Sequence, residues 1–284
     1  MVYQTIPIEV NYKKAGLLSH GFTPTLHTYV QDRPDARDTR RRPALIICPG
    51  GGYEFTADHE AEPVALRFVA MGYQCFVLRY SVAPMLFPGA LLELGEAVRL
   101  VRAHADEWDI DPTRVFVCGF SAGGHLAGSL GVFWNRDFVK DTLRCTDEHR
   151  PSGMILCYPV ITSGEAGHRG SFERLLGERY EELHDQLSLE KQVSADTPPA
   201  FLWHTVEDDC VPVENPLLFA QAMRAHGRPF ELHIFPKGPH GISLSDESIS
   251  PELEKRPTAI WPQLADNWMK RGQPDDGGTD SSDA

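Results

Sequence analysis

A serine between small residues lies near the middle of the chain, in the pentapeptide GFSAG (119–123). The aliphatic run RVFVC precedes it, and a segment rich in small residues, GGHLAGSLG, follows it. This pattern predicts a sharp turn from a strand into a helix, with the serine hydroxyl exposed and no space for bulk at the flanking positions. Ser121 is therefore the candidate nucleophile for acyl transfer. The amide of Ala122, at the start of the helix, is a candidate donor to the oxyanion that forms in such a reaction.

Three consecutive glycines follow another strand-like run, ALIIC, in the segment PGGGY (49–53). Because glycine leaves the backbone accessible, the amides of Gly51 and Gly52 can approach an oxyanion closely. A phosphate-binding loop is the alternative interpretation, but no Gly-Lys-Ser/Thr follows and the next segment is acidic. We predict an oxyanion hole formed by Gly51, Gly52 and Ala122. Tyr53 is a candidate substrate-binding residue, although aromatic side chains are more often simply part of a core.

A base and an acid are available further along the chain. His240 lies in PKGPHG (236–241), a Gly/Pro-rich loop after the strand-like run FELHIF, and is the candidate general base. An orienting carboxylate is expected in VEDDCVP (206–212), at the end of another apolar run. Asp208 and Asp209 compete for this role, with Glu207 a more distant candidate. Residue types alone leave the choice between the two aspartates open.

Two other histidines compare poorly with His240 as a base. His125 is four residues after Ser121, and we predict that it packs or forms hydrogen bonds beneath the site. His204 lies within a strand-like run and is predicted to be a satisfied core residue. The spacing of His, Cys, Asp and Glu resembles no metal site, so we expect neither a metal nor a cofactor.

The order of elements predicts how these residues are positioned. Short apolar runs alternate with segments of helical periodicity, which indicates an α/β fold with a mostly parallel, doubly wound sheet. The first stretch (2–32) is predicted to form antiparallel edge strands. A polar, helix-containing segment (162–199) interrupts the alternation, and we predict that it is a cap over the site. We expect one domain over residues 1–271 and a disordered acidic tail over 272–284.

The composition excludes several classes of partner. The 284 residues are 42% hydrophobic and 24% charged, which is typical of a globular chain. With 27 Lys and Arg against 40 Asp and Glu, the formal net charge is −13, so we expect neither nucleic acid nor an anionic membrane as a partner. No apolar run approaches the length of a membrane helix and no signal peptide is apparent, so we expect a cytoplasmic protein. A homo-oligomer is compatible with this composition.

Several motifs resemble those of α/β-hydrolases, and more narrowly those of bacterial esterase/lipase-type enzymes related to acetylxylan and feruloyl esterases, including xylanase-associated esterases. The resemblance runs from about Ala44 to Trp268. One position departs from the lipase-type pattern, since this chain has Pro49 where lipase-type relatives carry His. The segments that carry it are CPGGGY (48–53), EAEPVAL (60–66), FVLRYSVAP (76–84), GFSAGGHLA (119–127), GSFERLLG (170–177), SLEKQVSADTPPAFLWHT (188–205), VPVENPLLFAQAM (211–223) and PKGPHG (236–241).

This resemblance implies a Ser-His-Asp esterase that acts on a small-molecule ester. Carried over by position, Ser121 is the nucleophile, His240 the base and Asp208 the orienting acid. The family implies short acyl groups, often acetyl groups on sugars such as xylo-oligosaccharides. The alternatives are an amide or peptide hydrolase, such as a formamidase, on the same fold, and a non-catalytic binding protein on a hydrolase scaffold.

Overall fold

The fold is taken from a computed structural model of the chain. It describes residues 1–33, 37, 39–247, 249–250 and 257–271. The predicted acidic tail (272–284) lies outside the described residues.

Eight strands of the described residues form one sheet in the order β1-β2-β4-β3-β5-β6-β7-β8. The pairs β1–β2 and β2–β4 are antiparallel, and every other neighbouring pair is parallel. The expected α/β fold, with antiparallel strands at the N-terminal edge, is therefore confirmed. The strands are β1 (Thr5–Pro7), β2 (Thr25–Tyr29), β3 (Arg42–Cys48), β4 (Gln74–Arg79), β5 (Ile110–Phe120), β6 (Gly153–Cys157), β7 (Ala200–Thr205) and β8 (Phe230–Phe235).

The central strands carry continuous apolar runs because both faces of the sheet are covered. In β3, Ala44 and Ile46 pack into one core layer, whereas Leu45 and Ile47 pack into the other. All four side chains are fully buried. Continuous apolar runs are the expected sequence of such strands, since successive side chains point to opposite faces.

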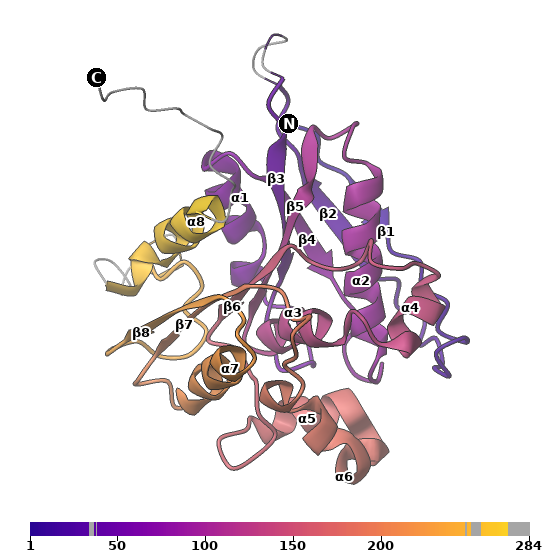
Figure 1. Cartoon of the computed structure of the whole chain (residues 1–284), viewed down its shortest axis with the longest axis vertical. Helices are drawn as coiled ribbons and strands as arrows, with labels where there is room; N and C mark the ends of the chain where they lie inside the picture. Colours follow the sequence, from indigo (N-terminus) through magenta and orange to yellow (C-terminus); the bar gives the residue numbers. More distant parts are fainter. Residues whose placement is uncertain (34–36, 38, 248, 251–256, 272–284) are drawn as a thin grey trace, which may run out of the picture.

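Helices cover the two faces of the sheet separately (Figure 1). Helices α1 and α8 belong to one core layer, and α2, α3 and α7 belong to the other. Each connects two strands or follows the last one, as the alternating pattern predicts. Their bounds are α1 (Glu62–Ala70), α2 (Gly89–Ala103), α3 (Ala122–Phe133), α7 (Glu214–Ala225) and α8 (Trp261–Arg271).

The segment predicted to be a cap (162–199) consists of short helices between β6 and β7 (Figure 1). Its apolar residues, including Phe172, Leu176 and Leu189, join the core layer beneath α3 and α7. This segment is therefore anchored by apolar burial. Its elements are α5 (Arg169–Leu176), η2 (Gly177–Arg179), α6 (Tyr180–Leu183), η3 (His184–Leu187) and η4 (Leu189–Lys191), while a further helix, α4 (Asp137–Leu143), precedes β6.

In the part of the chain that the structure describes, no helix combines the length and apolar character needed to cross a bilayer.

Candidate active site

Ser121 occupies a strained turn between β5 and α3. Its backbone has φ 54° and ψ −119°, a left-handed conformation that costs a non-glycine residue free energy. The flanking glycines make the turn possible. A Cβ at Gly119 would lie 2.0 Å from the Gly123 carbonyl oxygen, and one at Gly123 would lie 2.1 Å from the Cys48 carbonyl oxygen. The G-x-S-x-G pattern is thus a steric requirement of this turn.

Ser121, His240 and Asp208, which we call the candidate triad, form one line of hydrogen bonds. His240 Nε2 lies 2.8 Å from Ser121 Oγ, and His240 Nδ1 lies 2.7 Å from Asp208 Oδ2. Because the carboxylate can only accept, Nδ1 carries a proton and Nε2 is left to accept one from the serine hydroxyl. The three residues follow the carboxyl ends of β5, β8 and β7, where these parallel strands bring distant parts of the chain together.

The two competing aspartates lie in different environments. Asp208 is 6% exposed, and its second oxygen, Oδ1, accepts hydrogen bonds from the amides of Cys210 at 3.0 Å and Val211 at 2.9 Å. Asp209 is exposed. The structure therefore brings Asp208, and not Asp209, to the imidazole of His240.

The carboxylate of Asp208 is favoured despite its burial. Burial raises the pKa of this carboxyl, but the hydrogen bond and charge of His240 and the Val211 amide outweigh that effect, so the net pKa is lowered. An ionised Asp208 can hold the imidazole in one tautomer and stabilise it when it becomes charged.

The predicted oxyanion donors flank the serine. Ala122 is the first residue of α3, and the loop with Gly51 and Gly52 follows β3, which is the neighbour of β5 in the sheet. Within the described residues, no hydrogen bond engages the amides of Gly51, Gly52 or Ala122. Unengaged amides beside a nucleophile can donate to an oxygen that becomes negative during a reaction.

Tyr53 lies beneath the loop and not on its surface. Its side chain is 3% exposed, and its hydroxyl is 2.9 Å from His125 Nδ1. His125 Nε2 donates to the Leu187 carbonyl at 3.0 Å, so Nδ1 accepts from the tyrosine. The predicted position of His125 under the site agrees with this geometry. Tyr53, which we predicted to bind substrate, instead joins the glycine loop to α3 and the cap.

His125 makes the stability of the fold dependent on pH. Burial lowers the pKa of the His125 imidazole from its ordinary 6.5 to about 4. Because the unfolded chain binds this proton more tightly, His125 stabilises the fold fully above pH 6.5, and that contribution is lost as the pH falls toward 4. We expect the residue to account for a loss of about 3 kcal/mol of unfolding free energy between about pH 7 and about pH 4.

Urea denaturation of the wild type and of His125→Gln at both pH values tests this expectation. The glutamine amide does not titrate and can still donate to Leu187. The decline between the two pH values should be smaller in the variant by about 3 kcal/mol. Equal declines in the two proteins would contradict the assignment.

His204 is buried as predicted, but it is not fully satisfied. Its Nδ1 lies 2.9 Å from the Thr205 amide, while its Nε2 has no hydrogen-bond partner among the described residues. That nitrogen is 3.8 Å from Asp208 Oδ2, which is too far for a hydrogen bond but close enough for favourable electrostatics.

The segment predicted to be a cap places polar groups near the predicted oxyanion loop. The Ser171 hydroxyl and one Arg174 guanidinium nitrogen of α5 would each lie 3.8 Å from a Cβ placed on Gly52. His168, just before α5, forms a 2.8 Å hydrogen bond with Ser171. Burial, followed by the charges of His240 and Arg174, lowers the pKa of His168, so its imidazole is held neutral near the candidate triad.

Glu60 and Tyr158, which the sequence reasoning did not select, are also brought to this region. Both are buried, and Tyr158 lies with its ring against that of His240 at a centroid distance of 5.1 Å. The signal that could have found Glu60 is an acidic residue within the EAEP segment, shortly after the glycine loop.

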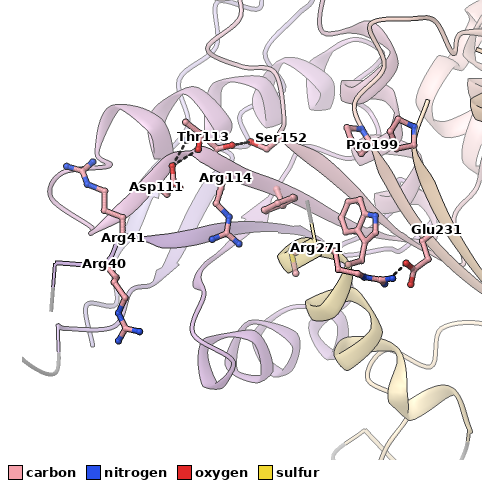
Figure 2. Close-up of a pocket in the computed structure, with 13 residues that line it drawn as sticks. Arg40, Arg41, Asp111, Thr113, Arg114, Ser152, Pro199, Glu231 and Arg271 are labelled. Carbon is pink, nitrogen blue, oxygen red and sulfur yellow. Dashed lines mark hydrogen bonds and ion pairs between the residues drawn. The ribbon is translucent and has the colours of Figure 1, made fainter. Parts of the chain in front are cut away.

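A separate hollow of about 950 Å³ lies at the opposite, amino ends of the parallel strands (Figure 2). Arg114 of β5, Ser152 before β6 and Pro199 before β7 are among the residues that line it. Arg271 pairs there with Glu231 at 2.6 Å. No member of the candidate triad lines this hollow, so it is not part of the candidate active site.

No group of three or more His, Cys, Asp or Glu residues in the described ranges is arranged to hold a metal ion.

The chain is similar to known α/β-hydrolase sequences. The profile of the family described as BD-FAE matches residues 33–223. Endo-1,4-beta-xylanase B of Butyrivibrio fibrisolvens is 39% identical over 85% of this chain, and the acetylxylan esterase of Xylanibacter ruminicola is 34% identical over 71% of it. The matches cover 37% and 41% of these two proteins, so the chain spans about two fifths of their length.

Solved structures share the fold over nearly the whole chain. An acetyl ester-xyloside bifunctional hydrolase from Caldicellulosiruptor lactoaceticus is 41% identical with a TM-score of 0.80, and the match covers 94% of this chain and 96% of that one. The carboxylesterase Cest-2923 of Lactobacillus plantarum is 26% identical with a TM-score of 0.81, over 95% and 98% of the two chains.

Proposed function

Because the chain belongs to the BD-FAE family of α/β-hydrolases, we propose that it is a serine esterase that removes short acyl groups, chiefly acetyl, from sugar hydroxyls such as those of xylo-oligosaccharides. The observation that carries this proposal is the hydrogen-bonded line from Ser121 through His240 to Asp208 on a strand-turn-helix elbow. We also infer that residues 1–271 act as one catalytic domain with the segment 162–199 as its cap.

In the proposed reaction, Ser121 Oγ attacks the ester carbonyl while His240 Nε2 accepts the hydroxyl proton. The tetrahedral oxyanion accepts hydrogen bonds from the amides of Gly51, Gly52 and Ala122. The C–O bond to the alcohol then breaks, and His240 returns the proton to the departing oxygen. Water repeats the sequence on the acyl-enzyme, which releases the carboxylic acid and restores Ser121.

Two observations support a sugar as the alcohol. The relatives include proteins named as an acetylxylan esterase and as an acetyl ester-xyloside hydrolase. The cap also presents the hydroxyl of Ser171, the imidazole of His168 and the guanidinium of Arg174 near Gly52. Hydroxylated substrates are favoured by such a polar wall, since each hydroxyl can replace its water partners with protein groups.

A substrate series tests the proposal. We expect kcat/KM on para-nitrophenyl esters to fall at least about tenfold from acetate to octanoate, because a site shaped for a short acyl group excludes a long one. Acetylated xylo-oligosaccharides should release acetate, whereas a short peptide and an N-formyl amide should react at least about 100-fold more slowly. Faster turnover of the amides would support the alternative, a hydrolase of amide or peptide bonds. Faster turnover of octanoate would contradict the preference for acetyl groups.

A further inference from the structure

Glu60 is a buried carboxylate that joins two parts of the candidate active site. It ends the short helix η1 (Asp58–Glu60) and is 2% exposed. Its Oε2 accepts a hydrogen bond from the Gly50 amide at 2.7 Å, and its Oε1 accepts one from the Tyr158 hydroxyl at 2.6 Å. Gly50 directly precedes the two glycines of the proposed oxyanion hole, so Glu60 holds the peptide from which that loop turns.

Tyr158 extends this connection to the loop that carries the base. It follows β6, is 1% exposed, and has a φ of 34°, which is unfavourable for a tyrosine. Its hydroxyl donates to Glu60 and also accepts from the Ser243 amide at 2.8 Å. Its ring packs edge-on against the imidazole of His240, with an interplanar angle of 70°. Tyr158 therefore contacts the loop that carries the base at two residues, His240 and Ser243.

Further hydrogen bonds connect the loop that carries His240 to η1. The Ser243 hydroxyl donates to the His59 carbonyl at 2.6 Å, and the Trp261 indole donates to the Ser243 carbonyl at 2.9 Å. The segments around Gly50, Glu60, Tyr158 and Ser243 thus form a closed set of contacts around the catalytic groups. Three parts of the chain, around residues 50–60, Tyr158 and Ser243, contribute to this set and lie far apart in sequence, so only the folded chain can bring them together.

The chemistry of the two donors explains why a carboxylate occupies this position. One backbone N–H and one tyrosine O–H approach different oxygens, and a carboxylate accepts at both. A glutamine has a single acceptor oxygen, so it cannot accept both bonds in the same geometry. A buried carboxylate without hydrogen-bond donors is unfavourable, so a displacement of Gly50 or Tyr158 away from Glu60 costs free energy. Glu60 therefore holds these two neighbours in fixed positions.

We propose that Glu60 is a positioning residue for ester hydrolysis, which sets the oxyanion loop relative to the His240 loop through Gly50 and Tyr158. The inference rests on the proposed esterase function. Glu60 does not contact the reacting atoms; it acts through the Gly50 peptide and the tyrosine. Small displacements of oxyanion donors reduce the stabilisation of the transition state more than they reduce binding of the ground state.

The test compares Glu60→Gln and Tyr158→Phe with the wild type on para-nitrophenyl acetate. We expect Glu60→Gln to lower kcat about 10- to 100-fold with KM changed less than about threefold, because the loss falls on the transition state. The dissociation constant of a phenylboronic acid, whose tetrahedral serine adduct places an oxygen in the oxyanion position, should rise by a similar factor. Tyr158→Phe keeps the ring against His240 and should lower kcat about 3- to 10-fold. The double variant should lose less than the product of the two single losses.

Glu93→Gln is the matched control. Glu93 is also fully buried, and it accepts one backbone amide, that of Ser81 at 2.6 Å, and one tyrosine hydroxyl, that of Tyr12 at 2.7 Å. Its substitution should lower the unfolding midpoint much as Glu60→Gln does, yet leave kcat within about twofold of the wild type.

The outcomes separate this inference from the proposed function. A wild type that hydrolyses the ester, with Glu60→Gln and Tyr158→Phe both within about twofold of it in kcat, would overturn the role of Glu60 alone. Equal losses of kcat in Glu60→Gln and Glu93→Gln would also overturn it, because they would reflect general destabilisation. If Glu60→Gln does not fold, an unchanged kcat and boronic acid affinity in Tyr158→Phe overturns it. A wild type that neither hydrolyses the ester nor reacts with a fluorophosphonate at Ser121 would instead contradict the proposed function.

Discussion

Ser121→Ala is expected to lower kcat on para-nitrophenyl acetate by about 10⁴-fold or more, since loss of the nucleophile removes the acyl-enzyme route entirely. Any remaining rate would come from binding and from the oxyanion amides acting on water. Alanine fits the same turn, because it removes only the hydroxyl and keeps the non-glycine backbone. The unfolding midpoint should therefore stay within a few degrees of the wild type.

Ser129→Ala is a control for this experiment. Ser129 is 2% exposed and lies on α3, two turns after Ser121, with its hydroxyl 3.5 Å from His125 Nδ1. Its kcat should remain within about threefold of the wild type, because no reacting atom contacts it. A fluorophosphonate should label the wild type and Ser129→Ala but not Ser121→Ala. The nucleophile assignment would be falsified if Ser121→Ala kept more than about a tenth of the wild-type kcat.

Asp208→Asn should lower kcat by about 10³- to 10⁴-fold, because the substitution changes the tautomer of His240. The amides of Cys210 and Val211 both require an acceptor where Oδ1 now lies. The asparagine oxygen should satisfy them, which turns the NH₂ group toward His240 Nδ1. That nitrogen must then accept, so Nε2 carries the proton and cannot take one from Ser121.

Asp209→Asn is the adjacent comparison. Asp209 has the same side chain and is exposed, so its neutral variant should keep kcat within about twofold of the wild type. Circular dichroism and thermal unfolding of both variants would establish that each is folded. A larger loss in Asp209→Asn than in Asp208→Asn would reverse the choice of triad acid and contradict the geometry.

The sequence predicted features whose cause is local. The elbow at Ser121 could be recognised because the backbone turn, the close approach at Gly119 and Gly123, and the strand and helix on either side all depend on neighbouring residues. The alternating apolar and helical segments likewise predicted the class of fold, since a strand covered on both faces carries a nearly continuous apolar run. The loop position of His240 followed from the glycines and prolines around it.

Tertiary structure decided the contacts between distant segments. Asp208 and Asp209 are adjacent acids of the same type, and only the path of the loop after β7 buries one of them against His240. Tyr53 was predicted to bind substrate, but the folded chain buries its side chain against His125 of α3.

Glu60 illustrates the same limit of local information. Its two donors come from segments 10 and 98 residues away in sequence, and no pattern near Glu60 identifies either one. Steric constraints between neighbouring residues can be recognised from consecutive positions of the sequence. A hydrogen bond between remote groups instead depends on strand order, register and the packing of the layers between them. For this protein the sequence by itself therefore determined the chemical groups and the turns that present them, and the folded sheet determined which of those groups meet.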